Sequence, residues 1–284
     1  MTDSSAARTA PSVGWMAAVS SVLIVSAYWF VLAGLARQWL DDPNYTHGLF
    51  VVPLALLLAW RRRDRVAAIA PRTSWAGVVF LVLSAVVYVV GIAAAELFLM
   101  RISLVGTVVG LVWATQGTGR TRVLAWPLLF LLLMIPLPYL VYYRLTFPLQ
   151  LQSSALTGSI LSWAGMPVLR EGNVLRLEGY SLEVVTACSG LRSIMTLGAM
   201  ALFLVEFMDL GRWGRLFFLV LVIPVAVAAN SARLLLTAVI SAVSGPEAAE
   251  GFLHGVSGTG VFMLGLAALI VTGKAIEWLS ARRA

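Results

Sequence analysis

Three side chains that could carry out chemistry stand far apart in this sequence, each within or beside an apolar stretch. Cys188 is the only cysteine of the chain, and Arg233 and His254 follow it. A cysteine thiolate is a nucleophile, and a histidine can take up the thiol proton and pass it to a leaving group. An arginine can hold a carbonyl oxygen or a developing negative charge. Together these residue types predict acyl transfer by a cysteine.

Each of the three also has a structural interpretation. A single buried cysteine is more often a small apolar residue than a nucleophile, and a lone histidine often only lies at the membrane interface. Arg233 is harder to explain in this way, because a charge within an apolar span is costly and its own helix offers no nearby acid. Asn230 lies one turn before it and could orient it. Arg192 is the rival cation, which could instead neutralise a glutamate, and His47 is the alternative base.

The composition indicates a membrane protein. Of the 284 residues, 60% are hydrophobic and 12% are charged, and a soluble domain of this length has too little interior to bury so much apolar surface. A helix needs about 20 apolar residues to cross a bilayer. We therefore expect an all-α polytopic protein, one integral membrane domain over residues 1–284, with about eight spans. These are residues 13–36, 48–60, 75–92, 98–116, 122–143, 188–207, 216–243 and 253–273, the second being short, so that its helix could extend back toward Asn44.

The positions of the basic residues predict the orientation. Of 20 basic residues, thirteen fall in short polar segments on the side of both termini: Arg8, Arg61, Arg62, Arg63, Arg65, Arg72, Arg120, Arg122, Arg212, Arg215, Lys274, Arg282 and Arg283. Five fall on the opposite side, and two lie inside spans. The positive-inside rule places both termini in the cytoplasm. A weak signal-peptidase pattern at residues 34–36 follows an apolar run longer than a signal core, so we expect an uncleaved first helix.

This topology brings the three reactive residues to the external face. Cys188 begins the sixth span, where the N-terminus of a helix favours a thiolate. Arg233 lies about 10–15 Å below the outer surface, and His254 enters the eighth span from outside. The longest external segment, about residues 144–187, precedes Cys188. Its first part, 145–164, predicts an amphipathic helix on the membrane surface that ends at Gly165 and Pro167, and its second part predicts two short strands around Gly179.

Several segments together resemble the exosortase/archaeosortase family of membrane transpeptidases. They are Ala187-Cys188-Ser189-Gly190-Leu191-Arg192-Ser193, Asn230-Ser231-Ala232-Arg233, Phe252-Leu253-His254-Gly255, Met134-Ile135-Pro136-Leu137-Pro138, residues 165–173 and Thr46-His47-Gly48. The resemblance implies that Cys188 is the nucleophile and that Arg233 and His254 complete the site. Archaeal relatives carry a second arginine at the third place, so His254 indicates a bacterial exosortase of the inner membrane, with its site at the periplasmic face.

The resemblance also implies a substrate class. Exported proteins with a C-terminal motif, a transmembrane helix and a basic tail (PEP-CTERM-like tails) would be cleaved through a thioacyl intermediate. An acceptor amine, on a surface glycan or a lipid, or water would release the product, in connection with exopolysaccharide and surface protein sorting. We expect membrane lipids as neighbours, no nucleic acid, no cofactor and no metal, because the sequence has no metal-ligand cluster and no phosphate or dinucleotide loop. A transporter and a non-catalytic membrane partner of polysaccharide assembly are the alternatives; the first needs polar residues in many spans, and the second tolerates loss of Cys188.

Overall fold

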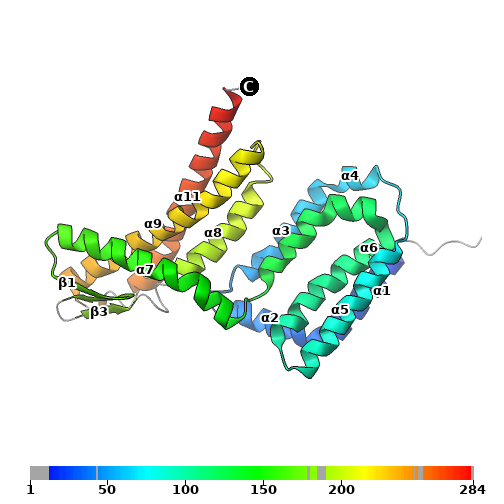
Figure 1. The fold of residues 1–284 in the computed structure, drawn as a ribbon, viewed down its shortest axis with the longest axis horizontal. Coiled ribbons are helices and arrows are strands. Elements are labelled where there is room, and N and C mark those ends of the chain that lie inside the picture. Colours follow the sequence, from blue (N-terminus) through cyan, green and yellow to red (C-terminus); the bar gives the residue numbers. More distant parts are fainter. Residues whose placement is uncertain are drawn as a thin grey trace, which may run out of the picture. The chain divides into compact units, whose positions relative to one another are not determined.

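The computed structural model describes residues 13–42, 44–177, 180–183, 190–245, 247–248 and 252–282, without the side chains of residues 13–18, 180, 183, 190–194 and 252–259. Helices make up most of these ranges (Figure 1). The chain divides into two compact units, which are described separately. Unit 1 contains Met1–Asp42 and Ala55–Ile135, and unit 2 contains Pro43–Leu54 and Pro136–Ala284.

Unit 1 is built around a pair of closely packed helices. Its elements are α1 (Val13–Ala27), α2 (Trp29–Asp41), the end of α3 (Gly48–Arg61), α4 (Arg63–Ala67), α5 (Trp75–Ala93), α6 (Leu97–Phe130) and the 3₁₀ helix η1 (Leu131–Met134). Glycines allow α5 and α6 to approach each other. A methyl group at Gly77 would collide with the backbone of Ala114, and one at Gly110 would meet the backbone of Leu81 at 2.9 Å. The predicted span 75–92 corresponds to α5, which has nearly the same bounds.

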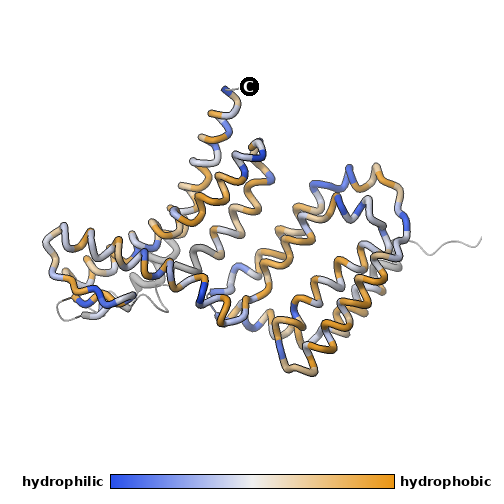
Figure 2. The backbone as a smooth tube through the Cα atoms, viewed as in Figure 1, coloured by the Kyte–Doolittle hydropathy of each residue, from blue (hydrophilic) through white to orange (hydrophobic). Residues whose placement is uncertain are grey.

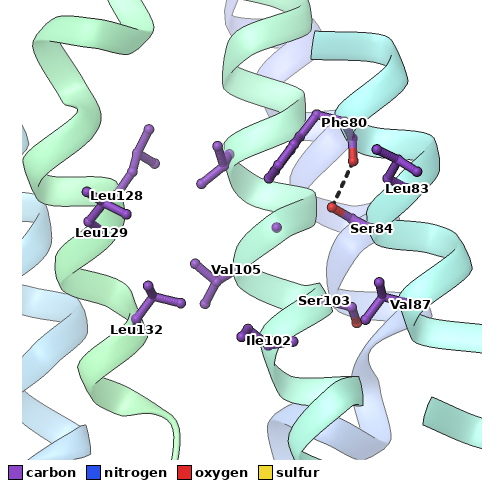
Figure 3. A pocket seen from close by; sticks show the side chains of 12 residues that line it. Phe80, Leu83, Ser84, Val87, Ile102, Ser103, Val105, Leu128, Leu129 and Leu132 are labelled. Carbon is purple, nitrogen blue, oxygen red and sulfur yellow. Dashed lines mark hydrogen bonds between the residues drawn. The ribbon is translucent and has the colours of Figure 1, made fainter. Parts of the chain in front are cut away.

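Helix α6 folds back on itself at Gly117, where φ is +80° and ψ is 170°. Figure 3 shows the result: Leu128 and Leu132 lie across one apolar pocket of about 300 Å³ from Val105. A straight helix would separate residues 105 and 128 by about 35 Å. The break confirms that residues 98–116 and the segment after residue 122 form separate helices. The predicted end of the second one at residue 143 is wrong, because Pro136 and Pro138 force an extended chain before α7 begins.

The first predicted span, 13–36, is also not one straight helix. The chain bends by 74° between α1 and α2, at Tyr28. The Tyr28 hydroxyl lies 2.9 Å from the Thr107 hydroxyl and 3.2 Å from that of Ser103, both on α6. Ser103 and Thr107 follow Tyr28 in the sequence by 75 and 79 residues, so the local sequence of α1 and α2 does not show the bend.

Four helices of the described residues are long and apolar enough to cross a membrane by length and composition, or five if the bent pair counts as one span. They are Trp75–Ala93, Leu97–Met134, Arg212–Ser244 and Gly260–Ala281, where Leu97–Met134 is counted as one stretch although it turns back at Gly117. Figure 2 shows apolar residues over most of the helices and polar ones concentrated at their ends. The structure therefore confirms a helical, multi-pass membrane protein, whereas it does not confirm the number of eight spans.

Unit 2 has α9 as its central element. Its elements are α7 (Tyr139–Trp163), β1 (Val168–Glu171), β2 (Val174–Leu177), β3 (Tyr180–Glu183), α8 (Gly190–Leu204), α9 (Arg212–Ser244), α11 (Phe252–Ala281) and the start of α3. Helices α7, α8 and α11 all pack on α9, with α8, α9 and α11 running side by side and α7 crossing them (Figure 1). A methyl group at Gly265 of α11 would lie 3.2 Å from Leu197 of α8 and 3.6 Å from Ala229 of α9, so the three helices meet closely there.

The short basic segments gather at one end within each unit. In unit 1, Arg120 donates a hydrogen bond to the carbonyl oxygen of Ile69 at 2.7 Å, which joins the segment 61–72 to the segment 117–122. In unit 2, the backbone N–H of Asp209 donates to Glu277 at 2.9 Å, which joins the segment before α9 to the end of α11. The positive-inside argument requires this pairing, since the segments of each pair must share one side of the membrane. Which side is cytoplasmic stays a prediction.

The segment before Cys188 forms a small antiparallel sheet of three strands in the order β1-β2-β3. Strands β2 and β3 are the two strands that the alternating pattern predicted, and Leu175 pairs with Leu182 between them. Strand β1 was not predicted; it pairs with β2 through a tight turn at Gly172, where φ is +65°. Gly165, with φ of +81°, ends α7 just before the sheet, as its position in the sequence indicated.

Helix α7 differs from the predicted surface helix 145–164 in its bounds and in its orientation. It begins at Tyr139, and its polar face, not its apolar face, is buried: Thr146, Gln150, Ser153, Ser154 and Thr157 face the interior of unit 2. Large apolar and aromatic side chains such as Tyr139 and Trp163 are exposed instead. A helix with this arrangement matches apolar surroundings outside and polar partners inside, which reverses the pattern of a helix that lies between water and lipid.

Candidate active site

A stripe of buried polar side chains runs along α9. Asn230, Arg233, Thr237 and Ser241 follow one another at spacings of three and four residues, so they share one face of the helix. Their exposed fractions are between 2% and 7%, and that of Arg233 is 6%. Since most of α9 is apolar, four polar groups on one buried face are the strongest chemical feature that the structure describes in unit 2.

Helix α7 holds α9 through its buried polar face. The Thr157 hydroxyl donates a hydrogen bond to the carbonyl oxygen of Ser231, and the Ser231 hydroxyl donates to the carbonyl oxygen of Ser153, each at 3.5 Å. Both contacts lie within one turn of Arg233. These residues were missed as parts of the site, although the polar positions of α7 recur at helical spacing, which was a visible signal. Nothing local shows which face of an amphipathic helix meets the protein, so the sequence does not reveal that the polar face of α7 is the buried one.

The sheet packs against the same region of α9. Leu175 and Leu182 are buried against Leu234, the residue after Arg233. The Ser154 hydroxyl of α7 donates to the carbonyl oxygen of Gly172 in the first turn of the sheet, at 2.9 Å. Strand β3, which leads toward Cys188, is therefore anchored beside the helix that carries Arg233.

The structure places some of the predicted site residues and not others. Cys188 lies outside the described residues, between the end of β3 at Glu183 and the start of α8 at Gly190. Arg192 and His254 lie in α8 and α11, but their side chains are outside the description. The predicted meeting of Cys188, Arg233 and His254 around one cleft therefore stays a prediction.

The helices nevertheless define the levels of Arg233, of the start of α8 at Gly190 and of the backbone of His254. Gly265, Leu197 and Ala229 lie at one level, where α11, α8 and α9 touch. At 1.5 Å per residue, Arg233 stands about 6 Å beyond that level, Gly190 about 10 Å and the backbone of His254 about 16 Å, all in the same direction. These three backbone levels lie within about 10 Å of one another along the helices.

His47 lies elsewhere in unit 2. It is buried in the turn before α3, which begins at Gly48 and does not extend back to Asn44 as considered from the sequence. The ring of Tyr45 lies 6.5 Å from that of His47 and 6.0 Å from that of Tyr142, near the start of α7. Tyr142 is eleven residues before Ser153, about 16 Å along α7, so His47 lies near the opposite end of this helix from the polar stripe.

Within the described part of the chain, no group of three or more His, Cys, Asp or Glu side chains is arranged to hold a metal ion. The buried polar side chains that share the stripe with Arg233 are the Thr237 and Ser241 hydroxyls and the Asn230 amide, which are suited to hydrogen bonding. The arrangement can thus bind and orient a polar group, such as a peptide carbonyl, next to a fixed positive charge.

The sequence profile of the transmembrane exosortases matches residues 39–271, which contain Cys188, Arg233 and His254. The chain belongs to the transmembrane exosortase family. Exosortases are in general cysteine transpeptidases of the membrane, and they act on exported proteins that carry C-terminal sorting signals. The family resemblance of the sequence is confirmed by this match. No curated protein and no solved structure matches the exosortase described here.

Proposed function

We propose that this exosortase cleaves the C-terminal sorting tail of exported proteins with Cys188 as nucleophile, Arg233 as the oxyanion and substrate contact and His254 as general base and acid. The observation that carries the proposal is the burial of Arg233 on α9, beside the sheet that leads into the Cys188 segment. An arginine held at 6% exposure on this helix is suited to stabilise a negative charge that develops at a reaction centre beside it.

The proposed reaction has two steps, the acylation of Cys188 and the release of the acyl group. His254 takes the proton of the Cys188 thiol, and the thiolate attacks the scissile carbonyl carbon, so that a C–S bond forms. Arg233 stabilises the oxyanion, the C–N bond breaks, and His254 gives its proton to the leaving amine. An acceptor amine or water then gives a proton to His254 and attacks the thioester carbonyl carbon. The C–S bond breaks, and the Cys188 thiolate takes the proton back from His254.

The substrate class follows from the location of the site. A tail with a short motif, a transmembrane helix and a basic end (a PEP-CTERM-like tail) would lie in the bilayer beside the enzyme and present its motif at the external face. With both termini in the cytoplasm of a bacterial inner membrane, α9 runs outward from Arg212 and the sheet lies at the periplasmic end. The acceptor would be an amine on a surface glycan or a lipid, in connection with exopolysaccharide.

The distribution of buried polar groups favours this proposal over a transporter. In the described residues, most of the buried polar side chains belong to α7 and α9, whereas unit 1 has three: Ser84, Arg101 and Ser103. A transport path would need polar groups across several spans. A non-catalytic partner in polysaccharide assembly is distinguished by experiment, since it would not need Cys188.

The test is the processing of a tailed reporter in cells that carry each variant at matched membrane levels. Cys188→Ala removes one sulfur atom and should leave the enzyme in the membrane but the reporter uncleaved, because covalent catalysis has no route through alanine. Arg233→Ala should be nearly as inactive, and His254→Ala should retain slow turnover if the helix terminus already favours the thiolate. Ser159→Ala, an exposed change on α7, is the control. Full cleavage by Cys188→Ala would refute the proposed function.

A further inference from the structure

A pocket of about 260 Å³ lies at the end of α9 that is remote from the basic segment. It is lined by Met166 and Pro167 of the loop after α7, Leu177 of β2, and Ala238, Ser241 and Ala242 of α9. Five of the six lining side chains are apolar, whereas polar atoms, the Ser241 hydroxyl among them, form nearly half of the exposed lining. The pocket is therefore suited to an apolar side chain whose backbone remains near polar groups.

The buried polar stripe connects this pocket to the candidate active site. Arg233, Thr237 and Ser241 are one turn apart in succession on the same face of α9, and Ser241 belongs both to the stripe and to the pocket. The eight residues from Arg233 to Ser241 span about 12 Å along the helix. The pocket therefore lies on the same face of α9 as Arg233, within the length of a few residues of extended peptide.

We propose that this pocket binds one side chain of the exported substrate, two to four residues to the N-terminal side of the scissile bond. The inference rests on the proposed function, in which Arg233 contacts the scissile carbonyl. An arginine side chain can reach outward by up to about 6 Å, which leaves about 6–12 Å to the pocket, or two to four residues at about 3.3 Å each.

The direction follows from the course of α9. The helix begins at the basic segment with Arg212 and Arg215 and ends at the pocket, so the pocket lies farther from that segment than Arg233 does. In a tail anchored by its transmembrane helix, the exported domain precedes the scissile bond and lies outside. Residues on the N-terminal side of the bond therefore lie toward the pocket, and residues on its C-terminal side enter the membrane.

A neighbouring pocket provides a matched control. It has about 310 Å³ and lies between α7 and β1, lined by Ala155, Ser159 and Arg170 among others. Ala155 and Ala242 are both helical alanines that line a pocket of similar size. The Ala155 pocket does not include residues of the Arg233 stripe, so the same substitution at the two alanines separates substrate binding from a general effect on the fold.

The first experiment is disulfide trapping. Cys188 is the only cysteine, so Cys188→Ser with Ala242→Cys has one thiol at the pocket. The probe is an exported reporter with a tripartite tail from the source genome and a single cysteine, moved through the six positions before the scissile bond. Because a disulfide needs Cβ atoms within about 4.5 Å, cross-linking under mild oxidation should peak at one position two to four residues before the bond. Ala155→Cys should show no such peak. An absence of the peak at Ala242→Cys, or equal cross-linking at both sites, would overturn the proposal.

The second experiment fills the pocket. Ala242→Leu adds three carbon atoms and should slow processing of the wild-type tail by roughly tenfold or more, since even one methylene in an apolar pocket can have an effect of that size, and Ala155→Leu should not. Replacing the tail residue found by trapping with alanine should restore processing by Ala242→Leu. Unchanged processing by Ala242→Leu, or a defect that no tail position relieves, as expected if a lipid chain fills the pocket, contradicts the inference. Either of these outcomes contradicts the pocket assignment but leaves the proposed function intact as long as Cys188→Ala does not cleave the reporter. The pocket assignment and the proposed function are therefore tested separately.

Discussion

Leu175→Ala should release the sheet from α9 and thereby lower processing without disturbing unit 1. The Leu175 side chain is 0% exposed and packs on Leu182 and Leu234. The substitution removes three carbon atoms, about 2.4 kcal/mol of transfer free energy, and the cavity that remains raises the cost to about 3 kcal/mol. Three strands of four residues have little stability of their own, so the docked state should lose about 100-fold in its equilibrium with undocked forms.

Hydrogen exchange of the purified protein in detergent, followed by mass spectrometry, measures this directly. The amides of residues 168–183 should exchange up to about 100-fold faster in Leu175→Ala, while those of α5 and α6 stay unchanged. Leu169→Ala is the matched control, since Leu169 lies in β1 but is 59% exposed, and its exchange should change by about twofold at most. Processing of a tailed reporter should fall in Leu175→Ala alone.

A double-mutant cycle sharpens the test. Leu234→Ala removes the other side of the same contact, so its effect and that of Leu175→Ala should combine to less than their sum. If Leu175→Ala and Leu169→Ala exchange and process alike, the sheet does not depend on its contact with α9. The link from the sheet to the Arg233 helix, and with it the support for the site, would then be lost.

Two further predictions concern topology and helix packing. A reporter fused after Arg63 should read cytoplasmic and one inserted at Glu171 external, because the basic segments share one side; a cytoplasmic position for Glu171 would contradict the site assignment. Gly265→Leu should cost about 1–3 kcal/mol in thermal unfolding in detergent, since even a methyl group there lies 3.2 Å from Leu197. Gly260→Ala in the same helix should be neutral or stabilising by up to about 1 kcal/mol, because its added methyl group meets nothing within 4 Å; equal losses would show that the helices do not meet at Gly265.

The sequence alone determined the class of protein and the course of several helices. Lipid imposes a length and an apolar composition on each span, so residues 75–92 and 216–243 could be recognised without any knowledge of their neighbours. The alternation around Gly179 predicted two of the three strands, since period-two patterning is also local. The family signature was equally visible, because it depends on short motifs in a given order.

Features that depend on distant partners could not be predicted in this way. The residue at the bend, Tyr28, has its hydroxyl partners on α6. The return of α6 at Gly117 brings Leu128 across one pocket from Val105, which the composition of a 34-residue helix does not reveal. The sequence showed that α7 is amphipathic. An amphipathic pattern defines two faces, but only the tertiary structure decides that the polar one meets α9.

The same division applies to the candidate site. The sequence identified Arg233 and Asn230 by chemical type, because charged and polar groups in an apolar span are rare and costly. The tertiary structure added Ser153, Thr157 and the Leu175–Leu234 contact, which place the sheet and α7 against the Arg233 helix. The sequence states the residue types, whereas the distances between them depend on how the helices pack. Helices α11, α8 and α9, for example, come close at Gly265, where an added methyl group would lie 3.2 Å from Leu197.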